Sequence, residues 1–181
     1  ARALSYSNNI ISAKTLLEIG VNNVIECAHR CRIKGVLNPY PALALGCVDS
    51  TLFEVVGMFN VFANEGMYVE PHTIRWVKDE WGKKIYRASH DKGQAVSARV
   101  ASQIGHALMA GLERKRKGSK QWIDSAAMSK TGTTNDSRTC WFVGSTPELT
   151  TGIYVGCDDN RPMGRYVYPV HTAYPIWRDL H

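Results

Sequence analysis

Two short motifs contain the residues of this 181-residue chain that are best suited to chemistry. Lys130-Thr131-Gly132-Thr133-Thr134 leads into a predicted strand, and Ser7-Asn8-Asn9 stands at the start of a predicted helix. A Ser-x-Asn motif followed by Lys-Thr-Gly is part of a signature for acyl transfer through an ester on a serine. Lys-Thr-Gly alone is a weak pattern, and it gains weight from the Ser-x-Asn upstream.

Each residue of these motifs also has an ordinary structural interpretation. Ser7 can simply cap a helix, and Lys130 can be an edge-strand lysine that opposes aggregation. Thr131 and Thr133 suit any strand, because β-branched residues have high β-propensity. Taken one residue at a time, the structural and the chemical interpretations both stay open.

The elements that must position these motifs follow from periodicity and from turn and cap residues. Helices are expected over 9–18 (stopped by Gly20), over 23–32, from a capping box at Thr51 to Gly66, from Ser97 through Leu112, and over 172–180. A hairpin is expected within 73–89, and strands over 127–133, 140–145 and 150–157. Helices first and an antiparallel sheet after them predict an α+β domain.

Six ordered blocks carry a resemblance to a known family. They are Ala3–Asn9 (ALSYSNN), Leu43–Asp49 (LALGCVD), Phe62–Pro71 (FANEGMYVEP), Met128–Gly144 (MSKTGTTNDSRTCWFVG), Tyr154–Gly164 (YVGCDDNRPMG) and Tyr174–Asp179 (YPIWRD). Together they resemble the transpeptidase domain of class A penicillin-binding proteins. The resemblance implies an α+β fold, the C-terminal portion of a penicillin-binding/serine β-lactamase-like transpeptidase domain. Its antiparallel sheet, five-stranded in the complete domain, is flanked by helices, and residues 1–181 form the C-terminal part of this single domain.

The resemblance also implies an activity and a role for each residue of the two motifs. The complete domain would be a peptidoglycan DD-transpeptidase that cross-links stem peptides through an acyl-serine intermediate and binds β-lactams. Lys130 would hold the Ser7 hydroxyl, Ser7 would relay a proton to the leaving amine, and Asn9 would bind the substrate's amide carbonyl. The backbone N–H of Thr133 would donate to the oxyanion. The residues expected to bind substrate are Thr131, Gly132, Thr133 and Thr134.

The nucleophilic serine has no convincing candidate in this chain. In the family a Ser-x-x-Lys precedes Ser-x-Asn, whereas Ser89-His90-Asp91-Lys92 follows it and lies in a polar stretch rather than on a helical turn. The expectation is that an upstream part of the same protein carries the nucleophile, a transglycosylase domain and a membrane anchor. The chain alone is then expected to be inactive. By the same resemblance, the protein lies at the extracytoplasmic face of the inner membrane, and its partners are stem peptides, β-lactams and the upstream part.

Departures from the family pattern keep two alternatives open. Ser129 stands where the family usually has glycine, Thr139-Cys140 replaces a usual Asp-Ala, and Tyr166–His171 departs from a Gly-rich approach to the last helix. A catalytically degenerate domain that binds wall peptide or a partner is one alternative. A DD-carboxypeptidase or β-lactamase-like hydrolase, which uses water as the acceptor, is the other.

Composition adds little to these hypotheses. The formal charge of +6 is partly concentrated in Arg114–Lys117 with Lys120, which is typical of the solvated end of a helix, and a nucleic-acid partner is not expected. The five cysteines form no Cys-x-x-Cys pair, and Cys27 and Cys31, one helical turn apart, are expected to be small buried residues rather than metal ligands. No apolar stretch reaches the roughly 18 residues of a membrane helix. Neither a metal nor a cofactor is implied.

Overall fold

The computed structural model describes residues 2–88, 92–116 and 126–181. Its helices are α1 (Arg2–Ser5), α2 (Asn9–Ile19), α3 (Val21–Arg30), α4 (Leu52–Ala63), α5 (Ala98–Arg116) and α6 (Ala173–Leu180), with short 3-10 turns at Pro41–Leu45 and Asn135–Ser137. Its strands are β1 (Met67–Val69), β2 (Trp76–Lys78), β3 (Lys84–Arg87), β4 (Lys92–Gln94), β5 (Met128–Thr133), β6 (Thr139–Ser145) and β7 (Thr150–Gly156).

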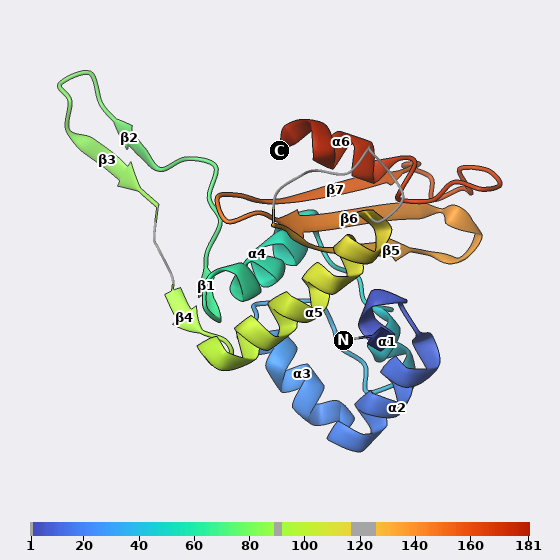
Figure 1. Ribbon diagram of the computed structural model, residues 1–181. Coiled ribbons are helices and arrows are strands. Elements are labelled where there is room, and N and C mark those ends of the chain that lie inside the picture. The colour runs from blue at the N-terminus through green and yellow to red at the C-terminus, as the bar shows by residue number, and fades with distance from the viewer. Residues whose placement is uncertain (1, 89–91, 117–125) are drawn as a thin grey trace.

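An antiparallel sheet with the strand order β5-β6-β7 forms the centre of the fold. Figure 1 shows α4 and α5 on one face of this sheet and α6 on the other, and both faces are in contact with those helices. This arrangement confirms the predicted α+β class. The described residues contribute three strands to the central sheet, where the complete domain is expected to have five, and the remaining strands form two separate antiparallel pairs, β1 with β4 and β2 with β3.

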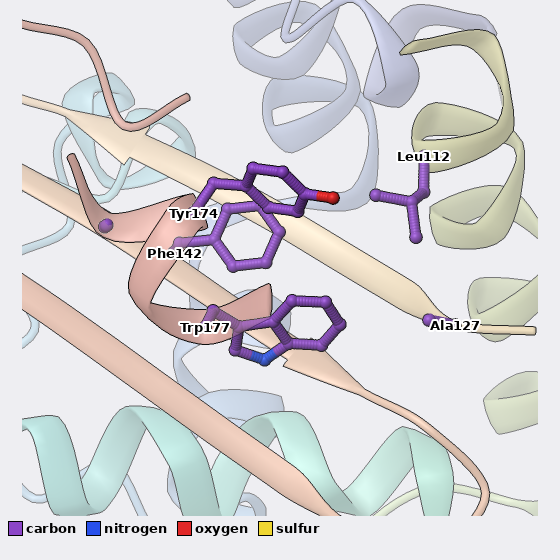
Figure 2. Close-up of a cluster of buried hydrophobic side chains, with 6 residues drawn as sticks. Leu112, Ala127, Phe142, Tyr174 and Trp177 are labelled. Carbon is purple, nitrogen blue, oxygen red and sulfur yellow. The ribbon is translucent and has the colours of Figure 1, made fainter. Parts of the chain in front are cut away.

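Alternation along β6 explains why both faces of the sheet are covered. Successive side chains of a strand point to opposite faces. Phe142 therefore packs with Tyr174 and Trp177 of α6, as Figure 2 shows. The ring centroids lie 5.1 Å apart in both pairs. The next residue, Val143, packs on the other side with residues of α4 and α5. Burial of each of these large side chains contributes about 1.5–3 kcal/mol to the stability of the domain.

The absence of a side chain at Gly144 allows α6 to lie close to the sheet. A Cβ at this position would lie 2.6 Å from Cζ2 of Trp177, which is far below van der Waals contact. The Trp177 side chain is fully buried, and its indole N–H donates to the Gly144 carbonyl at 3.4 Å. Glycine here is therefore required by close packing and not by backbone conformation.

Several local predictions are confirmed, with small shifts at the boundaries. The capping box of α4 is present: the Thr51 hydroxyl accepts from the Glu54 N–H at 3.2 Å, and the Glu54 carboxylate accepts from the Thr51 N–H at 2.9 Å. The Thr51 N–H and the Lys34 N–H, the latter at 3.0 Å, both donate to the Glu54 carboxylate and hold the pKa of this carboxyl below its ordinary value. The helix predicted over 23–32 is α3. It starts two residues before the predicted position, at Val21, and ends two residues early, at Arg30.

The helix α1 and the strands β1 and β4 were not predicted from the sequence. The short helix α1 precedes the Ser-x-Asn motif, and β4 pairs Lys92 with Val69 at the far end of β1. From the sequence, Lys92 stands out only as the last residue of a Ser-x-x-Lys motif. Such a motif needs a helical turn, whereas Lys92 lies in strand β4. Ser89, His90 and Asp91 lie outside the described residues, as does the basic run beyond residue 116.

Candidate active site

The two motifs that are 123 positions apart in the chain meet at one hydrogen bond. The ammonium of Lys130 on β5 donates to the hydroxyl oxygen of Ser7 at 2.6 Å, and it also donates to the carbonyl of Thr131 at 2.7 Å. Because the donor is a charged ammonium, both hydrogen bonds are charge-assisted, and both are short. Lys130 is half-buried while Ser7 is exposed, so the contact lies at the surface of the domain.

Ser7 has a left-handed backbone, with a φ of 50°. Its N–H donates to the Leu4 carbonyl at 3.1 Å, and the N–H of Asn8 donates to the Ala3 carbonyl at 3.0 Å. These two bonds are those of a Schellman motif, in which the left-handed position after the helix is usually glycine. Serine in this position costs about 1–2 kcal/mol. Strain of this kind is often found at functional sites.

The helix-cap interpretation of Ser7 is wrong, because its neighbour performs that role. The Asn8 side chain accepts from the N–H of Ile11 at 3.0 Å and caps α2. The Ser7 hydroxyl is thereby left to Lys130. Asn9 is the first residue of α2, and its exposed side chain makes no hydrogen bond within residues 2–88, 92–116 and 126–181.

The strand that carries Lys-Thr-Gly lies at an edge of the central sheet. Within the described part of the chain, β5 pairs only with β6, so its other edge is open to an extended ligand. Gly132 lies opposite Trp141, where a Cβ would come within 3.3 Å of the Trp141 Cβ. The Trp141 ring in turn packs edge-on against Tyr154 at 4.9 Å. The row formed by Gly132, Trp141 and Tyr154 is thus closely packed at the end of the sheet.

The hydroxyls predicted to bind a carboxylate do not share a face with Lys130. Side chains alternate along a strand, so Thr131 and Thr133 lie on the opposite face of β5 from Lys130 and Gly132. Thr131 is half-buried and Thr133 is exposed. The structure therefore brings Ser7 to Lys130 and places the two threonine hydroxyls separately, on the other side of the strand.

Thr134 has a structural contact that sequence reasoning missed. Its hydroxyl oxygen accepts from the Thr139 N–H at 2.8 Å and lies 3.2 Å from the Thr139 hydroxyl. These bonds close the connection between β5 and β6, which contains a left-handed residue at Asp136. No periodicity in the sequence signals this contact, because it depends on the exact path of the turn.

A small cavity lies beneath the contact between Ser7 and Lys130. Its volume is about 20 Å³, enough for roughly one water molecule, and its walls come from α1, α5 and β5. The polar part of the wall includes Ser5, Ser129 and Thr131 besides Ser7 and Lys130. In the described residues no group of three or more His, Cys, Asp or Glu side chains is arranged to hold a metal ion.

None of the five cysteines lines this cavity, and all five are free thiols. Cys31 is buried as expected, and burial raises the pKa of its thiol to about 11. Cys27, also expected to be buried, is only half-buried, whereas Cys140 is fully buried in β6 and Cys47 is exposed. Among the described helices, none combines the length and the apolar character needed to cross a bilayer.

Comparison with known proteins identifies a family. Residues 1–166 match the family model of the penicillin binding protein transpeptidase domain. The chain is 32% identical over 186 residues to penicillin-binding protein 1A of Neisseria meningitidis serogroup A, and 30% identical over 181 residues to penicillin-binding protein 1A of Aquifex aeolicus. Each match covers 98% of this chain but only 23% and 24% of the relative, so the chain spans about a quarter of the curated relatives' length.

Solved structures show the same likeness. The crystal structure of penicillin-binding protein 1A from Haemophilus influenzae is 26% identical, with a TM-score of 0.83 over 97% of this chain and 32% of that chain. The PonA1 protein from Mycobacterium tuberculosis in complex with penicillin V has a TM-score of 0.86 at 22% identity, covering 98% of this chain and 54% of that one. The second likeness concerns the fold alone.

Proposed function

The chain belongs to the penicillin-binding protein transpeptidase domain family, and from this premise we propose that it is the C-terminal part of a peptidoglycan DD-transpeptidase domain. The nucleophilic serine would come from a preceding segment of the same protein, which the partial coverage of the relatives supports. The observation that carries the proposal is the 2.6 Å hydrogen bond between Lys130 and Ser7. It joins the Ser-x-Asn and Lys-Thr-Gly motifs, and neither motif alone is specific.

In the first step a serine Oγ attacks the carbonyl carbon of the penultimate D-alanine of a stem peptide. The new C–O bond forms an acyl ester, and the C–N bond to the terminal D-alanine breaks. The attacking hydroxyl loses a proton and the leaving amine gains one, and Ser7 would relay this proton because its hydroxyl already accepts a hydrogen bond from the Lys130 ammonium. An acceptor amine then attacks the ester and restores the serine, which completes the cross-link.

The open edge of β5 would bind the donor peptide as an additional strand. Gly132 lets a peptide backbone approach without an intervening Cβ, and the N–H of Thr133 would donate to the oxyanion that develops during attack. Asn9, with its exposed side chain, would bind an amide carbonyl of the substrate. The hydroxyls of Thr131 and Thr133 would bind the terminal carboxylate of the peptide or of a β-lactam.

Thr134 would contribute by holding the turn after β5 rather than by touching the substrate. Its hydroxyl oxygen is engaged by Thr139, and this contact helps to fix the end of the strand at Thr133. By the same family membership, we place the full-length protein in the cell envelope with its transpeptidase domain on the extracytoplasmic side.

The test is labelling of the full-length protein with fluorescent penicillin. Replacing Lys130 with alanine should slow acylation by at least about 10²-fold, a typical loss for one group that acts in proton transfer. Lys14, an exposed lysine of α2, is the matched control, and its alanine variant should be acylated at the parent rate. Unchanged labelling of the Lys130→Ala protein would exclude the role given to Lys130.

Product analysis separates the alternatives that remain. With a stem-peptide substrate, a transpeptidase yields a cross-linked dimer, whereas a carboxypeptidase or β-lactamase-like hydrolase yields a shortened peptide. A full-length protein that binds no penicillin at all would favour a degenerate wall-peptide or partner-binding domain. If the 181-residue chain alone were acylated, the nucleophile would lie inside it, and the proposed division of the site would be wrong.

A further inference from the structure

The hairpin formed by β2 and β3 projects away from the rest of the domain, as Figure 1 shows. It spans residues 75–88 and is closed at its base by a bond from the Ala88 N–H to the Arg75 carbonyl at 3.0 Å. All three residues of β2 and all four of β3 are exposed. Neither the contact between Ser7 and Lys130 nor the edge of β5 involves this hairpin.

The tip of the hairpin is a preformed turn that presents an indole to the outside. The Asp79 carboxylate accepts from the N–H groups of Trp81 at 3.1 Å and Lys83 at 2.8 Å, and Gly82 supplies a left-handed residue with φ of 84°. The carboxylate is thus used inside the turn. The Trp81 side chain is 82% exposed, so its position is determined by the turn and not by packing.

Apolar side chains lie on both faces of the hairpin. Trp76 pairs with Arg87 and Val77 pairs with Tyr86, and adjacent positions of a strand point to opposite faces. Trp76 is 47% exposed and Tyr86 is 50% exposed. Exposed apolar surface of this kind marks an interaction site. A ligand on one flat side would cover only half of it, whereas a lipid interface surrounds an inserted hairpin on every side.

The charge of the hairpin indicates the chemistry of its partner. Five basic residues and two acidic ones occur within residues 75–88, so this short segment carries half of the formal +6 of the chain. The basic residues are Arg75, Lys78, Lys83, Lys84 and Arg87. The Lys78 ammonium lies 5.0 Å from the centre of the Trp76 ring. Cations therefore accompany the aromatic rings along the hairpin, and the partner must be anionic.

We propose that the β2–β3 hairpin docks on an anionic lipid surface, with Trp81 inserted among the headgroups and the surrounding lysines on the phosphates. Indole rings prefer the membrane–water interface. Each basic residue close to an anionic bilayer strengthens binding about fivefold. The hairpin would thus be a second contact with the membrane, distinct from any anchor elsewhere in the protein.

Flotation of the 181-residue chain with vesicles tests the proposal. Vesicles with about one third phosphatidylglycerol should retain the chain, pure phosphatidylcholine vesicles should not, and raising the salt concentration should release it. Lys83→Gln with Lys84→Gln should weaken binding about 30-fold, and Trp81→Ala should weaken it about tenfold. Lys14→Gln with Lys34→Gln removes the same charge from exposed positions elsewhere and should weaken binding far less.

Four results would overturn the proposal. Equal binding to neutral and anionic vesicles would exclude recognition of anionic lipid. If the Lys14/Lys34 control lost as much vesicle binding as the Lys83/Lys84 variant, binding would depend on the net charge of the chain and not on the hairpin. Absence of vesicle binding, with retention on purified wall polysaccharide instead, would assign the hairpin to an anionic glycan. In the full-length protein reconstituted in the same vesicles, brominated lipids should quench tryptophan fluorescence less after Trp81→Phe. An unchanged degree of quenching would place another part of the protein over the hairpin.

Discussion

Replacing Ser7 with glycine and with alanine separates the backbone role of this position from the role of its hydroxyl. Both variants lose the hydrogen bond from Lys130. They differ in the backbone, because φ at Ser7 is 50° and a Cβ is disfavoured there by about 1–2 kcal/mol. Glycine also has more conformational entropy than alanine in the unfolded chain. This lowers the stability of the glycine variant by about 0.5–1 kcal/mol and offsets part of the gain. The glycine variant should therefore be more stable than the alanine variant by about 1 kcal/mol.

Two assays on the complete transpeptidase domain measure the two roles. In thermal unfolding, about 1 kcal/mol corresponds to a melting temperature about 2–4 °C higher for Ser7→Gly than for Ser7→Ala in a domain of this size. In penicillin acylation, both variants should be slowed alike, by about 10²–10⁴-fold, because neither has a hydroxyl to relay the proton. The glycine variant would then be the more stable protein and equally inactive.

A matched pair of variants at Glu65 provides the control. Glu65 also has a left-handed backbone, with φ of 52°, and lies at the end of α4, away from the contact between Ser7 and Lys130. Glu65→Gly should exceed Glu65→Ala in stability by a similar amount, with acylation unchanged in both. Equal stability of the two Ser7 variants would refute the left-handed conformation in the complete domain. Normal acylation by Ser7→Gly would refute the relay through its hydroxyl.

Three further predictions concern the stability of the domain that holds the site. Gly144→Ala should destabilise the domain by about 1–3 kcal/mol because the new methyl overlaps the Trp177 ring. Gly93→Ala, which has nothing within 4 Å of the added carbon, should change stability far less. Urea unfolding measures both changes. Thr51→Ala should cost about 1 kcal/mol at pH 7 through loss of the α4 cap. The pKa of Glu54 is lowered on folding, so its contribution is complete above pH 4.5, the ordinary value for this carboxyl, and is lost as the pH falls through the lowered value. A Glu54→Gln domain should therefore show a smaller loss of stability in acid, and a pH dependence identical to that of the parent would contradict this account.

Local elements could be predicted from the sequence because their signals lie within a few residues. The capping box at Thr51, the hairpin within residues 73–89 and the stop at Gly20 each combine residue types with a backbone geometry that they favour. The three strands of the central sheet were recognised from β-branched and aromatic runs. The family blocks extended these predictions to the α+β class, because their order along the chain is itself specific.

Contacts between distant segments could not be predicted from the same signals. Serine at position 7 is compatible with a helix cap, and only the path of α1 shows that Asn8 caps α2 while Ser7 adopts the left-handed position. The contact between Thr134 and Thr139 depends in the same way on the path of the turn between β5 and β6. Such contacts depend on angles and distances set by the packing of whole elements, whereas a residue pattern records only the preferences of its own segment.

The sequence by itself determined the chemistry available: a lysine, a serine, an asparagine and a glycine-containing strand in a specific order. Only the tertiary structure decided that Lys130 reaches Ser7, that the hydroxyls of Thr131 and Thr133 lie on the other face of the strand, and that the aromatic hairpin stands apart from the core. The physical reason is that a side chain acquires its partner when helices and strands pack. That packing is driven by burial of apolar surface, which is not directional and therefore leaves the individual polar contacts to the final geometry.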